Sequence, residues 1–302
     1  MNASNFVEGV DFSLYFILAI SIFFLVGITV VMVYFLIRYS KKRNPVATNI
    51  DGNNKLEIIW TVIPTILVLF MFYFGWIGWK PMQKAPDNAM TVSAIGQMWK
   101  WSFEYPNGKF SDSLVVPVGK PVKLNLISKD VIHSLFIPAY RIKKDVVPGD
   151  TNMMWFVPQT EGSYVIECAE YCGQLHSYML SYVKVLNQDN FDKWLNSNEH
   201  TDEHPGLTLM KKNACLSCHT LDGRRLVGPS FKGLWGKTES VITGPLMKKK
   251  KVIVNRDYLY TSIREPIKDI VEGYPGNVMT SYDGILNDEE IDQIVRYIKS
   301  LK

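Results

Sequence analysis

The chain has 302 residues, which allows two or three domains. Its net charge of +4 is small and the sequence has no basic stretch with interleaved aromatic residues, so nucleic-acid binding is excluded as a function class. The four cysteines form two close pairs, which favours two cofactor sites over a disulfide framework.

The first eighty residues are far more apolar than the rest and contain two uncharged runs, 13–37 and 58–79. Each exceeds the roughly 20 residues that span a bilayer. The loop between them is rich in Lys and Arg over residues 38–45, whereas the N-terminal segment has acidic residues and no basic one. The positive-inside rule then places this loop in the cytoplasm. Both ends of the hairpin, and everything after residue 80, would lie outside the cytoplasm. We expect a transmembrane hairpin over residues 1–80; the alternative is a buried helical hairpin in a soluble protein.

Short apolar segments separated by Pro, Gly and Asn follow over residues 88–187. Their residues alternate between apolar and polar, which is typical of half-buried strands. Several short strands with turn signals between them predict an all-β sandwich or barrel. The clearest segments are T-V-S-A-I-G, W-K-W-S-F-E-Y, P-V-K-L-N-L-I, S-Y-V-I-E-C and S-Y-V-K-V-L.

Two thiols, one imidazole and one thioether lie within twelve residues of this region, at Cys168, Cys172, His176 and Met179. Thiolate and thioether are soft ligands, and imidazole beside them favours copper, zinc or iron. The thioether favours copper over zinc, and His133 can supply a second imidazole. Because a single blue-copper site needs one Cys, either one thiol is spare or both bridge a pair of metals. A Cys168–Cys172 disulfide on a turn is the remaining alternative.

Residues 188–205 are polar and are interpreted as a linker, with one possible helical turn. The segment Cys215-x-x-Cys218-His219 then matches the attachment sequence of c-type haem, in which two thioethers hold the porphyrin and the His is the proximal iron ligand. A thioredoxin-like redox pair is the alternative, but no βαβ pattern surrounds the motif. The domain spans residues 206–302 and ends in an amphipathic helix whose apolar positions have helical spacing.

Charge is divided unevenly between the two C-terminal domains. Residues 206–302 have 16 Lys and Arg against 11 Asp and Glu, whereas residues 80–205 have 12 against 14. A basic haem domain can be steered onto an acidic neighbour by such a difference. The sequence therefore predicts docking of one domain on the other within the chain.

Several motifs together resemble subunit II of cytochrome c oxidase. They are G-Q-M-W-K-W-S-F-E-Y (96–105), D-V-I-H-S (130–134), K-x-D-x-x-P-G (143–149) and the Cys168–Met179 loop. The segment V-G-P-S-F-K-G-L-W-G resembles the loop after the haem motif of small class I cytochromes c. The resemblance implies three parts: a two-helix transmembrane hairpin, an all-β cupredoxin-like CuA domain and an all-α class I cytochrome c domain.

The resemblance also implies a ligand set for a binuclear copper centre, CuA. In that set Cys168 and Cys172 bridge two coppers through their sulfurs, and His133 and His176 each cap one copper. Met179 is a weak ligand to one copper, and the backbone carbonyl of Glu170 is a weak ligand to the other. The Glu170 side chain reaches a magnesium ion at the boundary with subunit I.

Further roles follow from the same resemblance. Trp99 is the ring through which electrons reach the copper centre; the next position, usually aromatic in the family, is Lys100 here. Glu57, in L-E-I-I-W-T-x-x-P, matches a Glu at the mouth of a proton path into subunit I, although an interfacial carboxylate is the simpler explanation. Asp130 and Asp145 match positions near the copper loop, where capping turns and orienting ligands are equally good roles.

Met279 is expected to be the sixth ligand of the haem iron, because Met/His ligation raises the haem potential in cytochromes c. It precedes the last helix, where cytochromes c place this ligand. The Pro that usually follows the ligand in the family is Thr280 here.

The sequence is therefore expected to be subunit II of a haem–copper cytochrome c oxidase with a fused cytochrome c domain. Electrons would pass from haem c to CuA and on to haem in subunit I, where O2 is reduced to water with proton pumping. A subunit of a CuA-containing nitric oxide reductase and a membrane-tethered electron carrier are the alternatives.

The expected partners are oxidase subunits I and III, the lipid bilayer, and an external cytochrome c or quinol-oxidising complex as electron donor. The expected location is the plasma membrane of a bacterium. The chain would cross that membrane twice, with both termini on the periplasmic or outer side.

Overall fold

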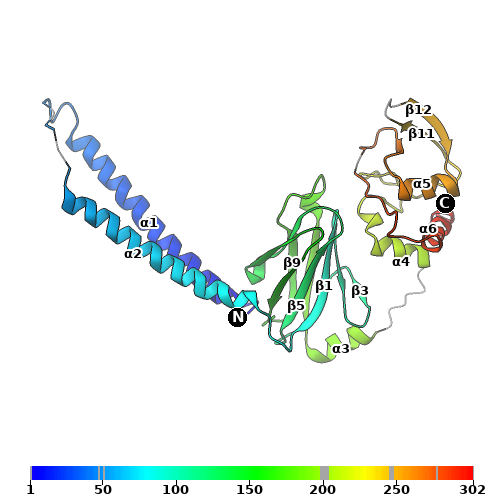
Figure 1. Ribbon diagram of the computed structural model, residues 1–302, viewed down its shortest axis with the longest axis horizontal. Coiled ribbons are helices and arrows are strands. Elements are labelled where there is room, and N and C mark those ends of the chain that lie inside the picture. The colour runs from blue at the N-terminus through cyan, green and yellow to red at the C-terminus, as the bar shows by residue number, and fades with distance from the viewer. Residues whose placement is uncertain are drawn as a thin grey trace.

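The computed structural model describes residues 2–46, 48–49, 52–197, 204–244, 248–276 and 278–301. Three parts follow one another along the chain: a helical hairpin, a β-sandwich and a smaller C-terminal domain (Figure 1). Short 3₁₀ turns accompany the main elements at Lys80–Gln83, Pro138–Tyr140, His176–Tyr178 and Cys215–Ser217.

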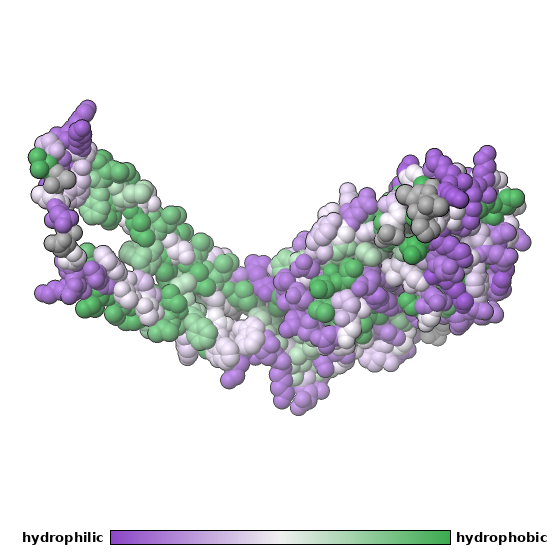
Figure 2. All heavy atoms as spheres, turned by 45° about the horizontal axis from the view of Figure 1, so that its top comes forward, coloured by the Kyte–Doolittle hydropathy of each residue, from purple (hydrophilic) through white to green (hydrophobic). Residues whose placement is uncertain are grey.

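The hairpin consists of α1 (Val7–Arg38) and α2 (Asn54–Trp79). These helices contain the two predicted spans, and their apolar side chains face outward along the whole hairpin (Figure 2). Such a surface is stable only in an apolar solvent, and both helices are long and apolar enough to cross a membrane. Asn53 begins α2 by accepting hydrogen bonds from the backbone N–H groups of Lys55 and Leu56.

The N-terminal segment ties the hairpin to the sandwich. Ser4 forms an isolated β-bridge with Pro158, and the ring of Phe6 packs edge-on against Trp155 with centroids 5.0 Å apart. The indole N–H of Trp155 also donates to the carbonyl of Pro81, just after α2. The segment before α1 and the segment after α2 thus both hold the sandwich against the end of the hairpin.

The sandwich has two five-stranded sheets. The first has the order β3 (Phe110–Ser111), β2 (Lys100–Glu104), β1 (Met90–Gln97), β5 (Val122–Ser128) and β8 (Thr151–Phe156). The second has the order β4 (Leu114–Pro117), β10 (Leu180–Leu186), β9 (Gly162–Cys168), β6 (His133–Ile137) and β7 (Ile142–Val146). Each sheet contains one parallel pair, β1 with β5 in the first and β4 with β10 in the second, and the buried side chains of the two sheets form one core. The predicted cupredoxin-like fold is confirmed.

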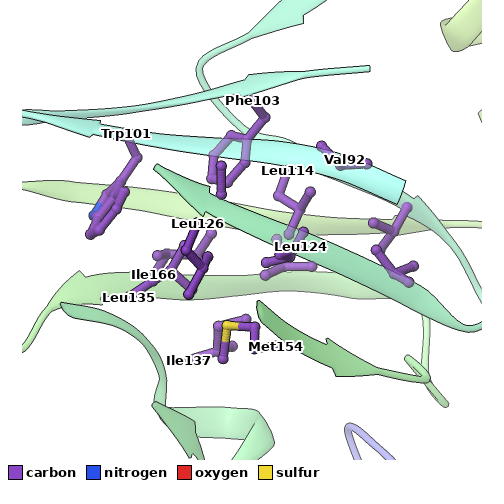
Figure 3. Close-up of a cluster of buried hydrophobic side chains, with 14 of the residues drawn as sticks. Val92, Trp101, Phe103, Leu114, Leu124, Leu126, Leu135, Ile137, Met154 and Ile166 are labelled. Carbon is purple, nitrogen blue, oxygen red and sulfur yellow. The ribbon is translucent and has the colours of Figure 1, made fainter. Parts of the chain in front are cut away.

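Alternate residues of each strand fill this core. Along β5, Val122, Leu124 and Leu126 are fully buried, while Lys123 and Asn125 between them are partly exposed. Because successive side chains of a strand point to opposite faces, this pattern puts one apolar row between the sheets. Figure 3 shows the side chains of both sheets meeting between the strands, with Trp101 at one end of the cluster.

The predicted linker is shorter than expected. Residues Gln188–Asn196 form helix α3, which begins at the Asn187 cap and packs on the sandwich. The side chain of Phe191 is 3% exposed, and the ring of Trp194 lies 4.9 Å from that of Tyr105. Burying one such ring contributes about 1.5–3 kcal/mol, which favours packing of this polar segment on the sandwich. Residues 198–203 of the predicted linker lie outside the described residues.

The C-terminal domain contains α4 (Pro205–Lys212), α5 (Arg256–Arg264) and α6 (Asp288–Ser300). Helix α6 is the predicted amphipathic helix: Ile291, Ile294 and Ile298 are buried, and a capping box joins Asn287 to Glu290. The structure corrects the all-α expectation, because a three-stranded sheet is added to these helices. Its strands, in spatial order, are β12 (Lys248–Ile253), β11 (Thr238–Thr243) and β13 (Asp269–Val271).

Candidate metal and haem sites

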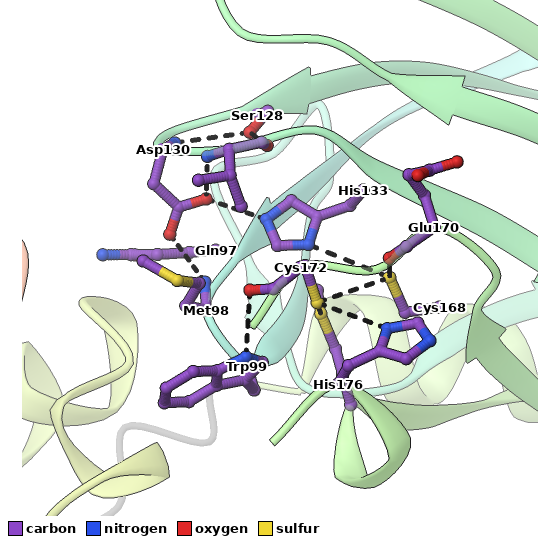
Figure 4. Close-up of polar contacts among 12 residues, drawn as sticks. Gln97, Met98, Trp99, Ser128, Asp130, His133, Cys168, Glu170, Cys172 and His176 are labelled. Atoms are coloured by element: carbon purple, nitrogen blue, oxygen red, sulfur yellow. Dashed lines mark hydrogen bonds and ion pairs between the residues drawn. The ribbon is translucent and has the colours of Figure 1, made fainter. Parts of the chain in front are cut away.

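Two loops of the sandwich bring the soft donors together. Cys168 ends β9 and Met179 directly precedes β10, so the loop between these adjacent strands carries four of the predicted ligands. His133 begins β6, which pairs with β9 at Leu135 and Cys168. The side chains converge at one end of the sandwich (Figure 4).

The donor atoms form a compact, largely buried cluster. The Cys168 and Cys172 sulfurs lie 3.7 Å apart. His133 Nδ1 lies 3.9 Å from the Cys168 sulfur, and His176 Nδ1 lies 3.5 Å from the Cys172 sulfur. Met179 Sδ is 3.8 Å from the Cys172 sulfur. The two imidazoles thus lie next to different sulfurs, which leaves one imidazole for each of two metals held by the thiols.

The disulfide alternative does not describe this site. A disulfide requires an S–S distance of about 2.05 Å, whereas both cysteines are free and their sulfurs are 3.7 Å apart. Neither thiol is spare, because each one contacts a different imidazole.

The electrostatics of the thiol pair favour bound cations. Burial raises the pKa of Cys168, but its contacts with the His133 ring and with the backbone outweigh burial and lower it below the usual thiol range. Burial and the charge of Cys168 both raise the pKa of Cys172. The Cys168 thiolate therefore forms readily, and its negative charge opposes deprotonation of Cys172. A metal removes this conflict, because a coordinated thiol is deprotonated outright.

Asp130 orients the His133 ring. Its Oδ1 lies 2.7 Å from His133 Nε2, and the His133 side chain is 0% exposed. Because the carboxylate accepts the Nε2 proton, the lone pair of Nδ1 faces the sulfurs. The other oxygen, Oδ2, accepts the backbone N–H of Met98 at 2.7 Å. A carboxylate behind a ligating His is a common device of metal sites.

Glu170 has two separate polar groups at this site. Its carbonyl oxygen is 3.2 Å from the Cys168 sulfur, which suits the predicted weak ligand. Its carboxylate is exposed and points away from the sulfurs (Figure 4). The indole N–H of Trp99 donates to the carbonyl of Cys172 at 3.2 Å, which joins this ring to the copper loop.

The C-terminal domain encloses a second candidate site around an apolar cavity. Cys215, Cys218 and His219 line one part of it, and Met279 lines it from the segment before α6. Both cysteines are free. Most other lining residues are apolar, among them Val227, Phe231, Leu259, Ile263, Ile270 and Ile294. A flat apolar ring system with two thioether attachments fits this set of groups.

The His219 ring is held in the orientation that an iron ligand needs. Its Nδ1 lies 2.7 Å from the carbonyl oxygen of Pro229, so Nδ1 carries the proton and Nε2 keeps its lone pair. The ring stacks on Phe231 with centroids 4.5 Å apart. On another side Gly228 is so close that a Cβ there would lie 2.5 Å from the ring. Burial also lowers the pKa of His219, which keeps the imidazole neutral.

The sequence matches known protein families along most of its length. Models of the cytochrome c oxidase subunit II transmembrane domain, its periplasmic domain and cytochrome c match residues 1–75, 109–186 and 204–302. Cytochrome c oxidase subunit 2 of Alkalihalophilus pseudofirmus is 32% identical over 95% of this chain and 86% of its own length.

The chain belongs to the cytochrome c oxidase subunit II family. Subunit 2 of Bacillus subtilis is 28% identical over 90% of this chain and 83% of its own length. The solved periplasmic domain of subunit II from Bradyrhizobium japonicum is 31% identical over 37% of this chain and 94% of that chain, with a TM-score of 0.36.

This subunit II is a membrane protein and part of a haem–copper oxidase, which implies a subunit I partner. The family implies copper in the sandwich, and the cytochrome c domain implies haem. The donor set at each site fits the implied group. Glu57 lies apart from both sites, in the first turn of α2 at the loop end of the hairpin, and its role stays a prediction.

Two buried residues of subunit II were missed by sequence reasoning. Gln97 and Tyr282 lie beside the haem cavity and hydrogen-bond to each other, although 185 residues separate them. Gln97 is part of the G-Q-M-W-K-W motif, but nothing in the sequence signals a partner so far away. The place of Gln97 two residues before the predicted metal-site Trp99 is a signal that could have indicated it.

Proposed function

We propose that this subunit II carries electrons from an external donor, through a covalent haem c and a binuclear CuA centre, to haem in subunit I. There O2 is reduced to water, coupled to proton pumping. The observation that carries the proposal is the pair of buried donor sets within one chain, separated by the segment Gln97–Trp99. Both sets are rich in protein ligands, which suits electron transfer and leaves the oxygen chemistry to subunit I.

In the copper domain, Cys168, Cys172, His133 and His176 would hold the two metals. Met179 and the Glu170 carbonyl would complete the set as weak ligands. When bound, the two coppers supply a redox couple that exchanges one electron with little change in geometry. The sandwich supports this by rigidity, because the ligands come from loops between paired strands. Asp130 keeps the His133 lone pair turned to the metal.

In the haem domain, Cys215 and Cys218 would hold a porphyrin through thioether bonds, and His219 and Met279 would ligate its iron. Met/His ligation raises the potential of such a haem. Pro229 fixes the His219 tautomer through its carbonyl. The apolar lining of the cavity excludes water from the haem.

Trp99 is the group through which electrons reach copper, and its hydrogen bond to the Cys172 carbonyl supports this role. We assign Glu57 to the mouth of a proton path into subunit I and the Glu170 carboxylate to a magnesium ion at the same boundary. Exposed apolar side chains around the copper loop support a partner surface there; they include Val131, Ile132, Tyr171 and Tyr178.

The remaining assignments concern the assembly. Subunit III is a further partner, and the donor is an external cytochrome c or a quinol-oxidising complex. The basic loop of the hairpin lies in the cytoplasm of a bacterium, and both termini lie outside it. A nitric oxide reductase subunit or a tethered carrier is less well supported, because the relatives that match most of this chain are oxidase subunits.

Gas consumption by the purified complex tests the function. The complex is isolated through a tag on this chain, beside a Cys172→Ser copy. Cyanide-sensitive O2 uptake that is lost in the variant supports the oxidase and places copper on the path. Consumption of nitric oxide without O2 uptake would overturn the proposal, and so would the absence of any large haem subunit in a preparation that consumes neither gas.

A further inference from the structure

We propose that the haem domain is held on its own copper domain by a built docking surface, formed by Gln97–Lys100 on one side and Tyr282 with the C-terminal end of α4 on the other. This surface positions the haem for transfer to copper. The inference rests on the proposed function, since it concerns how the two sites of that function are held together.

The first contact is a buried chain of hydrogen bonds. The Gln97 side-chain N–H donates to the Tyr282 hydroxyl at 3.1 Å, and that hydroxyl donates to the carbonyl of Asn213 at 2.7 Å. The three residues are 6%, 7% and 4% exposed. A buried amide or hydroxyl without its partner is costly. Because these bonds are directional, they select one orientation of the haem domain and disfavour others.

The second contact is at the end of a helix. Lys100, in β2, donates to the Lys211 carbonyl in the last turn of α4 at 2.7 Å, and its ammonium lies 2.7 Å from the Asp112 carboxylate. Carbonyls in the last turn of a helix carry partial negative charge, and the Lys211 carbonyl also accepts the backbone N–H of Ala214 at 3.3 Å. The ammonium therefore caps α4 from the other domain. Lys212 adds a cation–π contact, 4.7 Å from the centre of the Phe110 ring.

Apolar residues of the haem domain fill the area near these polar contacts. Cys218, Val227 and Val278 pack against the core of the copper domain. Cys218 is one of the two proposed haem attachments, so the haem side of this domain, and not its back, faces copper. In Figure 1 the domain lies beside the sandwich, next to the sheet that contains β1 and β3.

The docking segment is continuous with the copper site. Met98 lines the haem cavity, and its backbone N–H is held by Asp130, which also orients His133. The next residue, Trp99, is bonded to the copper loop. In Figure 4 the Gln97 side chain points away from the sulfurs, with Asp130 above it and Trp99 below it in this view. One short segment thus touches both sites, and displacement of the haem domain lengthens the path between them.

The test uses the whole oxidase with both centres loaded. In Tyr282→Phe the hydroxyl is lost and the ring is kept; in Lys100→Met the ammonium is lost and the stem is kept. The rate of electron transfer from haem c to copper is measured after photochemical reduction of the haem. We expect each variant to slow this transfer about fivefold to tenfold, because loss of one hydrogen bond lowers the population of the docked arrangement by about that factor. The double variant loses both contacts and should slow the transfer further.

Two further measurements distinguish a loss of docking from a disturbed haem or copper site. The optical spectra of both centres, and direct reduction of copper by a small ruthenium complex, are expected to stay at wild-type values in all variants. Tyr260→Phe and Lys184→Met remove the same groups from α5 and from exposed β10, and should leave the transfer rate unchanged.

A double variant that transfers electrons at the wild-type rate would overturn the docking proposal while leaving the proposed function intact. Equal slowing by the two control variants would also overturn it. If the wild-type complex, with both centres loaded, shows no transfer from haem to copper, then the proposed function itself fails.

Discussion

Replacement of Gly228 by Ala should weaken the haem site through sterics alone. A Cβ at this position would lie 2.5 Å from Cε1 of His219, whereas ordinary contacts begin at 3.4 Å, so a shift of about 0.9 Å is needed. The ring cannot retreat, because Phe231 stacks on its face and Nδ1 is bonded to the Pro229 carbonyl. Overpacking of this kind costs about 1–3 kcal/mol.

We expect Gly228→Ala to lower the free energy of unfolding of the haem domain by that amount. The covalent attachment should survive, because the two cysteines are untouched. The assay is denaturant titration of the whole chain in detergent, followed by the absorption that reports iron–histidine ligation. Leu226→Ala is the matched control, because it truncates an exposed side chain of the same loop and should change stability by less than about 0.5 kcal/mol. A midpoint for Gly228→Ala equal to that of the control would refute the steric argument.

Three other changes have defined outcomes. Asp130→Ala removes the acceptor behind His133 and should weaken copper binding about 10- to 100-fold in a chelator competition; unchanged affinity would contradict the orienting role. Gly206→Ala puts a Cβ 2.1 Å from a backbone carbonyl of α6 and should destabilise the haem domain by about 1–3 kcal/mol in the same titration, with no loss of stability as the contrary result. Lys143 holds the pKa of Asp145 below its usual range, so this pair stabilises the fold above the ordinary Asp pKa and stops doing so as pH falls through the lowered value. Lys143→Met and wild type should therefore differ in stability at neutral pH and converge in acid; a difference that persists in acid would count against the pair.

Much of this molecule could be predicted from patterns within short segments. The long apolar runs predicted the hairpin, because they require a bilayer. The alternation of apolar and polar residues around Val122–Ser128 predicted the sandwich, because it requires a sheet with one buried face. The Cys215–His219 motif and the Cys168–Met179 loop each place their donors within a few residues, so the chain itself brings them together. His133 was included because a copper site of this kind needs a second imidazole and because D-V-I-H-S matches the family; the structure brings it to the loop through the pairing of β6 with β9.

The parts that were missed depend on contacts between distant residues. The sequence indicated one possible helical turn in the linker, but not the full helix α3, which packs on the sandwich through Phe191. The added sheet pairs Lys-rich β12 with β11, and its Lys249 and Lys250 form ion pairs with Glu272 and Asp269, so a run that looks like a solvated loop becomes a strand. The Gln97–Tyr282 contact depends on how two finished domains meet, which no local pattern encodes.

The central claim is that electrons pass through both centres of this chain on their way to O2. It is tested most directly by rapid-reaction absorption spectroscopy of the fully reduced complex mixed with O2, with the haem c and copper bands followed together. The account predicts that copper is oxidised first and that haem c is then oxidised as copper is reduced again, with both steps lost in Cys172→Ser. Continued O2 consumption while haem c stays reduced in the wild-type complex would contradict it.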